Sequence, residues 1–324
     1  MTRLPINETW PRYAGMLLPL VLLAGCGAPA RPPVAVRQSP WSPAAGIQGV
    51  RLETAHYDLK ITARDPVLRE ILPTFLEATF AEYQRILPPP EGRHQKLDVY
   101  LFDTREQWAA FTRRFVPQRA HVYLYIKAGG YVDQQTATAV VWDLGRDNTL
   151  TLLAHEGFHQ YLTKYFPEPV AAWLNEGLAA QWEAFDLQAG RPTFTPRLNY
   201  YRRNSLRESL AEPEGWIPLR KLLGMNAGEA VVQTGQVTRG YYAQVWSLVL
   251  FLREGGNAQY SRGFTRLLAD VGTDRILASV RAYQAGMPSA AGSSFGEMIL
   301  RHYVTEDLDT FERAYRDFCE RLVR

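Results

Sequence analysis

Residues 152–160 read Leu-Leu-Ala-His-Glu-Gly-Phe-His-Gln, within an apolar run long enough to form a helix. His155 and His159 are four positions apart, which places both imidazoles on one face of a helix. Both rings can therefore reach a single metal ion. Glu156 is turned partly away from that face, so it can take a proton from water instead of binding the metal. The alternative is a buried helix whose histidines only pack.

A third metal ligand is expected a short distance further along the chain. Pro167 and Pro169 end the first helix, and Trp-Leu-Asn-Glu-Gly follows at residues 173–177. A short turn and an antiparallel helix would bring Glu176 to the same metal. Alone, Glu176 would be a solvated helix charge, but two histidines and a glutamate form a known ligand set for hydrolytic zinc. Zinc suits this set because it keeps a fourth position open for water.

The two motifs together resemble those of the gluzincin metallopeptidases, most closely the small peptidase-MA-like (minigluzincin) bacterial members. The resemblance rests on H-E-x-x-H at 155–159 and W-L-N-E-G-L-A at 173–179. It implies an α+β, zincin-like fold, with a small mixed sheet lobe, a mainly helical lobe, and the zinc and glutamate helices between them. It also implies a zinc metallopeptidase in which His155, His159 and Glu176 bind Zn²⁺ and Glu156 is the general base.

A tyrosine is the expected stabiliser of the oxyanion. In alanyl-aminopeptidase-like gluzincins, a tyrosine at the start of a comparable helix has this role, and a phenol hydroxyl suits developing negative charge. By that resemblance Tyr242, in the segment 239–248, is the first choice and Tyr241 the alternative. An aromatic pair that only packs at a helix start is the other interpretation. His302 is a further candidate donor, by analogy with the histidine of thermolysin-like enzymes.

Two departures from the larger families narrow the expected activity. Thermolysin-like enzymes carry an aspartate four residues after the zinc glutamate, which orients a ligand histidine. Here that position is Ala180. The aminopeptidase class carries G-x-M-E-N, and the nearest stretch here is Gly-Gly-Tyr-Val-Asp at 129–133. An endopeptidase acting on peptide or protein is therefore favoured. The alternatives are a lipid-anchored binding protein without turnover and a zinc amidase that cleaves cell-wall peptide.

The N-terminal segment, residues 1–25, is predicted to be a lipoprotein signal peptide. Two arginines precede the apolar run from Met16 to Leu23, which is too short to span a bilayer. Leu-Ala-Gly-Cys at 23–26 resembles the bacterial lipobox, which implies cleavage before Cys26 and lipidation of its thiol. Gly27 then favours the outer membrane. A stray cysteine after an ordinary signal peptide is the alternative.

The composition adds limits on partners and stability. Residues 26–49, rich in proline, alanine and serine, are predicted to form a flexible tether behind the lipid. Lipidation of Cys26 would leave Cys319 without a disulfide partner, so a hydrophobic core must stabilise the fold. The formal net charge of +3 is too small and too dispersed to indicate nucleic-acid binding.

Residues 50–146 alternate between strand and helix patterns and predict an α+β lobe. Strands are expected at 56–62 and 97–102, a helix at 66–87, and another after a Thr104 cap. Residues 122–126 and 138–142 are also rich in strand formers. In gluzincins the sheet lends its edge strand to the substrate, so the resemblance makes Thr138 to Trp142 the candidate substrate-binding edge. An ordinary sheet edge is the alternative.

Residues 147–324 are predicted to be almost entirely helical and to carry the metal site. Asn148 or Thr149 is expected to cap the zinc helix. An apolar stripe on the last helix predicts core packing and not a cofactor site. Its members are Leu308, Phe311, Tyr315, Phe318 and Leu322.

Overall fold

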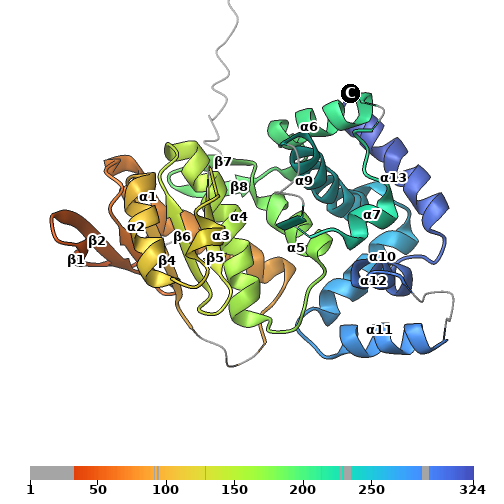
Figure 1. Ribbon diagram of the computed structural model, residues 1–324, viewed down its shortest axis with the longest axis horizontal. Helices are drawn as coiled ribbons and strands as arrows, with labels where there is room; N and C mark the ends of the chain where they lie inside the picture. Colours follow the sequence, from red (N-terminus) through yellow and green to blue (C-terminus); the bar gives the residue numbers. More distant parts are fainter. Residues whose placement is uncertain are drawn as a thin grey trace, which may run out of the picture. The chain divides into compact units, whose positions relative to one another are not determined.

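A mixed six-stranded sheet and a set of helices make up the fold of the computed structural model (Figure 1). The structure describes residues 33–324 except 91, 93–94, 128, 213, 227, 230–234 and 287–291. The predicted signal peptide and Cys26 therefore lie outside the described residues. Within the described part of the chain, none of the helices is long and apolar enough to span a membrane. The predicted α+β class is confirmed at this level.

The sheet has the spatial order β1-β2-β3-β4-β6-β5. Strands β3, β4 and β6 run parallel, and the remaining neighbours pair antiparallel. The strands span Arg37–Ala44 (β1), Ile47–Glu53 (β2), Tyr57–Ile61 (β3), Leu97–Phe102 (β4), Gly130–Asp133 (β5) and Thr138–Trp142 (β6). The strands predicted at 56–62 and 97–102 are confirmed as β3 and β4.

Helices cover both faces of this sheet. Alternate residues of β6 point to opposite faces, as in any strand: Ala139 and Val141 enter the main core with α1 (Pro66–Ile86) and α4 (Arg146–Tyr165). Val140 and Trp142 enter a second core with α2 (Arg105–Phe115). The predicted helix 66–87 is α1, and the predicted Thr104 cap of α2 is confirmed, because its side chain accepts from the backbone N–H of Gln107.

The edge of the sheet is formed by β5 and not by the segment predicted for it. Thr138–Trp142 forms β6, which pairs with β4 on one side and β5 on the other and is buried throughout. Residues 122–126 are not a strand, because a short helix, α3 (Ala120–Tyr123), and a turn occupy them. The strand-rich composition of β6 reflects burial on both faces, which an edge strand does not need.

The predicted flexible tether is wrong for residues 37–49. These residues form β1 and the start of β2, which pair as an antiparallel hairpin. Pro40 and Pro43 suggested a loop, since proline cannot donate a backbone hydrogen bond, but an outer strand tolerates it. Trp41 stabilises the hairpin, because its ring packs against Tyr100 at a centroid distance of 5.8 Å.

The remainder of the chain is mostly helical but also contains a hairpin that was not predicted. Strands β7 (Phe185–Gln188) and β8 (Arg191–Phe194) pair antiparallel. The predicted apolar stripe on the last helix is confirmed as buried. The helices are α5 (Ala172–Ala179), α6 (Tyr200–Ala211), α7 (Leu219–Gly224), α9 (Gly235–Leu250), α10 (Ala258–Asp270), α11 (Arg275–Gly286), α12 (Phe295–Tyr303) and α13 (Leu308–Leu322).

Two backbone features place α4 and α5. Gly145 is the N-cap of α4 at φ +86°, so the predicted caps Asn148 and Thr149 lie inside the first turn. Thr149 instead accepts from the Leu144 N–H and donates its hydroxyl proton to Asp143, which fixes the preceding loop. On α5, a Cβ at Gly177 would lie 2.6 Å from the Val245 carbonyl oxygen. Glycine therefore permits the close approach of α5 to α9.

Candidate metal centre

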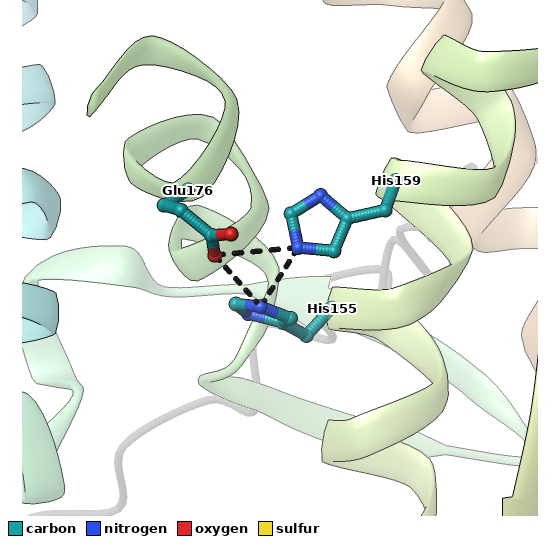
Figure 2. Close-up of side chains that lie close together, drawn as sticks. All are labelled: His155, His159 and Glu176. Carbon is teal, nitrogen blue, oxygen red and sulfur yellow. Dashed lines mark hydrogen bonds and ion pairs between the residues drawn. The ribbon is translucent and has the colours of Figure 1, made fainter. Parts of the chain in front are cut away.

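Three side chains from two helices converge on one point (Figure 2). His155 and His159 lie on α4, and Glu176 lies on α5. The two histidine Nε2 atoms are 3.1 Å apart. Glu176 Oε2 lies 3.4 Å from Nε2 of His155 and 3.3 Å from Nε2 of His159. The helical spacing and the turn between the helices therefore bring together the three residues that the sequence predicted to be ligands.

This triangle of atoms has the dimensions of a metal site. Tetrahedral ligands at the usual Zn–N or Zn–O distance of about 2.0–2.1 Å lie roughly 3.3–3.4 Å from one another. The two histidine–carboxylate separations match that value, and the separation of the two histidine nitrogens is slightly shorter. Glu176 Oε2 is also buried and, among the described residues, has no hydrogen-bond partner besides the two imidazole nitrogens, an arrangement that suits a bound cation. His155, His159 and Glu176 can therefore hold a metal ion.

The charges of the site favour a cation. Burial acts to lower the pKa of His155, but the carboxylates of Glu176 and Glu183 outweigh it and raise the pKa to about 10. The carboxylates thus stabilise positive charge at this point, and a metal ion that binds His155 would displace the proton and supply that charge instead. Burial also acts to raise the pKa of Glu176, but the two histidines hold it well below its usual range. The Glu176 carboxylate is thus ionised, as a metal ligand must be.

Polar partners orient both histidines from behind. Asn175 Oδ1 lies 2.8 Å from Nδ1 of His159, and Glu183 Oε1 lies 2.9 Å from Nδ1 of His155. Such contacts fix the ring orientation and direct Nε2 toward the metal. Glu183 follows a 3₁₀ turn (Ala180–Trp182) after α5. It contacts His155 from a position three residues beyond Ala180, whose side chain has no polar group.

Glu183 is itself held by α6. Arg202 donates to both of its carboxylate oxygens, at 2.7 and 2.5 Å, and the side-chain amide of Asn199 donates at 2.8 Å. Burial acts to raise the pKa of Glu183, but Arg202 and His155 lower it to about 2. The side chains of Glu183 and Arg202 are only 8% and 12% exposed, so this is a buried ion pair that breaks at high cost when one partner is removed.

Replacement of Glu183 by leucine is expected to weaken zinc binding by about 10–100-fold, the usual cost of losing a partner that orients a ligand histidine. The measurement is a competition titration against a chromophoric chelator. The single variant also leaves Arg202 buried without a carboxylate, which costs about 3–5 kcal/mol of folding stability.

A double variant separates the two effects of Glu183. Glu183→Leu combined with Arg202→Met removes both buried charges and is expected to recover most of the stability in chemical denaturation. Zinc affinity should remain low, because His155 still lacks the carboxylate at Nδ1. Recovery of full zinc affinity in the double variant would show that Glu183 does not orient His155.

A cavity of about 660 Å³ opens beside His155, one of the three candidate ligands. Glu156 lines it next to His155, as do Tyr242 and Tyr201. Burial raises the pKa of Glu156, which the neighbouring histidines partly offset, and this makes its carboxylate a stronger base once ionised. The cavity therefore presents a base beside the metal position.

The three candidate oxyanion donors lie in different environments. Tyr242 lines the cavity, and its ring lies 6.4 Å from the ring of His155. It is in the middle of α9, because the helix begins at Gly235 and not near residue 239. Tyr241 is fully buried, and His302 is exposed on α12 and lines a different hollow.

The environment of Tyr242 suits a hydrogen-bond donor. Burial raises the pKa of its phenol, and the nearby Glu176 acts in the same direction, so the hydroxyl keeps its proton. The guanidinium of Arg202 lies over the Tyr242 ring, 5.0 Å from its centroid, and holds the ring in place. Of the three candidates, only Tyr242 lines the cavity that contains Glu156.

Sequence reasoning missed Glu183, Arg202 and Asn199. Glu183 lies two helical turns beyond Glu176, so a continued helical register beyond Ala180 was a usable signal. Arg202 and Asn199 carried no signal, because only the tertiary approach of α6 brings them to the site. No family model matches this chain, and no curated protein matches it.

Proposed function

We propose that this protein is a zinc-dependent metallopeptidase of the gluzincin type, most simply an endopeptidase. The observation that carries the proposal is the triangle of His155, His159 and Glu176, whose edges of 3.1–3.4 Å match tetrahedral zinc. A base and a phenol donor line the adjoining cavity. A helix whose histidines only pack in the core would not require a base and a phenol donor in an adjoining cavity.

The residues divide the chemistry among them. His155, His159 and Glu176 would hold zinc, and the ion would supply Lewis acidity to a water molecule and to a peptide carbonyl. Glu156 accepts the proton of the attacking water and passes it to the leaving amine. Tyr242 donates its phenol proton in a hydrogen bond to the developing oxyanion. Glu183 and Asn175 keep the two histidines in the ligand orientation.

The peptide backbone is expected to pair with β5, the strand at the sheet edge nearest α4. An edge strand has free N–H and C=O groups that bind an extended peptide as an additional strand. Gly129, just before β5, lines the cavity that contains Glu156. A peptide on this edge would therefore pass the base, and the absence of a G-x-M-E-N segment favours internal cleavage.

Attachment to the cell envelope is part of the same proposal. The lipobox-like sequence that ends at Cys26 would tether the folded part to the outer membrane by a lipid. Metabolic labelling with a radioactive fatty acid tests this directly. Label should enter the wild-type protein and be absent from Cys26→Ser, and equal labelling of both would contradict the anchor.

The function is tested by zinc content and hydrolysis of casein by the purified protein. About one zinc per chain and casein cleavage that stops with chelator and returns with zinc are expected. Cleavage of cell-wall peptide but not casein would identify an amidase. Stoichiometric zinc without any hydrolysis would indicate a binding protein. Folded protein that binds no zinc would overturn the proposal.

A further inference from the structure

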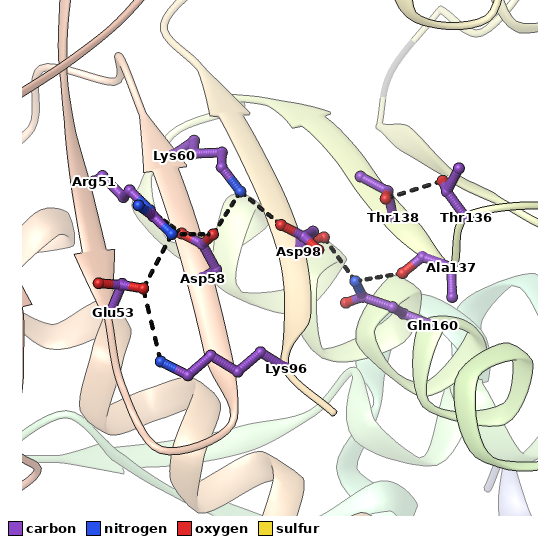
Figure 3. A network of polar contacts seen from close by, with 10 residues as sticks. All are labelled: Arg51, Glu53, Asp58, Lys60, Lys96, Asp98, Thr136, Ala137, Thr138 and Gln160. Carbon is purple, nitrogen blue, oxygen red and sulfur yellow. Dashed lines mark hydrogen bonds and ion pairs between the residues drawn. The ribbon is translucent and has the colours of Figure 1, made fainter. Parts of the chain in front are cut away.

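Gln160 connects the helix that carries both histidines to strand β4 and to the turn between β5 and β6. It follows His159 directly and is completely buried. Its side-chain amide donates to the carbonyl oxygen of Asp98 on β4 at 2.6 Å and to that of Ala137 at 2.8 Å (Figure 3). Both amide protons are therefore used, and each acceptor is a backbone group. A buried side chain with two such bonds fixes the position of the helix against the sheet.

Ala137 ends the turn between β5 and β6, and its backbone is strained. Its φ of +52° lies in the left-handed region, which residues other than glycine seldom adopt. Such a conformation persists only where its surroundings impose it. Asp133 accepts from the N–H and hydroxyl of Thr136 and so holds one side of the turn. Gln160 holds the other side through the Ala137 carbonyl.

A second contact ties the same turn to α4. The hydroxyl of Thr163, one helical turn beyond Gln160, donates to Gln134 Oε1 at 3.1 Å. At the opposite end of β5, a Cβ on Gly129 would lie 3.4 Å from the side chain of Leu152 on α4. The residues that flank β5 therefore meet α4 at Leu152 and Thr163, and Glu156 lies between these two positions on the helix. The edge strand and the base are held in one rigid arrangement.

We propose that Gln160 is a positioning residue, which fixes the β5 edge relative to the histidine helix so that a peptide paired with β5 presents its carbonyl carbon to the water that Glu156 deprotonates. This inference rests on the proposed function and names a residue that acts through the strand, not on the reacting atoms. A displacement of about 1 Å at the reacting centre can lower a rate by about 100-fold. The two hydrogen bonds of the Gln160 side chain thus determine the activity on extended substrates.

The test uses Gln160→Met, which keeps the size of the side chain and removes both donors. For a quenched peptide long enough to pair with all of β5, kcat/KM is expected to fall by about 10–100-fold. For a dipeptide amide that cannot reach β5, it should stay within about two-fold, as should zinc affinity. Equal losses on both substrates would overturn the proposal, since general damage to the site acts on both.

Gln181→Met is the matched control. Gln181 is also a buried glutamine, and its amide donates to two backbone carbonyls, those of Gly177 and Trp246, at 2.7 and 3.1 Å. It connects α5 to α9 and has no contact with the β5–β6 turn. Its loss is expected to lower stability without changing the ratio of activity on the long and short substrates. If Gln181→Met changed that ratio to a similar extent, the effect of Gln160→Met would not be specific to the β5–β6 turn.

Hydrogen exchange of backbone amides provides a readout that needs no activity. Exchange in residues 130–137 should rise in Gln160→Met and remain at the wild-type rate in Gln181→Met. Unchanged exchange in Gln160→Met would overturn the inference about the turn. If the wild-type protein cleaves no peptide, the proposed function fails, and this measurement still decides whether Gln160 holds the β5–β6 turn.

Discussion

Replacement of Glu156 by glutamine is expected to lower the rate of peptide hydrolysis by roughly 10²–10⁴-fold, the range for loss of a general base. Glutamine keeps the size of the side chain but cannot accept the proton of the attacking water. Zinc content should stay at the wild-type level, because Glu156 is not one of the three converging ligands. The measurements are kcat/KM on a quenched peptide and metal analysis of the same preparation.

Glu320→Gln is a suitable control for the Glu156 variant. Glu320 lies on α13, and its half-exposed side chain pairs with Arg316, at 3.6 Å. This surface variant should keep both zinc and activity, since an exposed pair contributes little. A Glu156→Gln protein with more than about a tenth of wild-type activity would assign the base to another group. Loss of zinc from that variant would instead show that Glu156 supports the metal site.

The metal ligands were predictable because their arrangement is mostly local. Two histidines four residues apart share a helix face in any α-helix, so the pattern at 155–159 determined their relation before any tertiary contact was known. Glu176 was predictable because a proline-terminated helix followed by a short turn leaves few paths for the chain. In the structure, Nε2 of His155, Nε2 of His159 and Oε2 of Glu176 form the three corners of one triangle.

The support around the ligands was not predictable, because it depends on packing between distant segments. Arg202 reaches Glu183 only because α6 packs against α9, which in turn lies on α5. No periodicity in the sequence around residue 202 contains that information. Ala180 showed only that the aspartate found at this position in thermolysin-like enzymes is missing from this sequence.

The order of strands was likewise not contained in local patterns. Thr-Ala-Val-Val-Trp at 138–142 is a strong strand sequence, and that strength comes from burial between β4 and β5. The true edge, Gly130–Asp133, is short and begins with glycine, so it reads as part of a turn. In β1, the two prolines hid a strand that the packing of Trp41 stabilises.

Replacement of His159 by alanine is expected to abolish stoichiometric zinc binding. It removes one of three ligands, and the loss in affinity should exceed the 10–100-fold or so that follows removal of an orienting partner. Binding to the wild-type protein at a free zinc concentration of about 1,000 times Kd adds about 4 kcal/mol of stability. That corresponds to a rise in Tm on the order of 10 °C for a chain of this size. Zinc should leave the Tm of His159→Ala almost unchanged.

His302→Ala is the matched control for this experiment, because it removes an exposed histidine on α12 that does not line the cavity at the ligands. It should retain one zinc, the zinc-dependent rise in Tm and full activity. The metal-free His159→Ala protein should keep its fold, because the Asn175 side chain, which faced the lost imidazole, is only partly buried and water can replace the contact. A zinc-dependent rise in Tm that is equal in His159→Ala and the wild type would place the metal elsewhere and remove the basis for hydrolysis at this site.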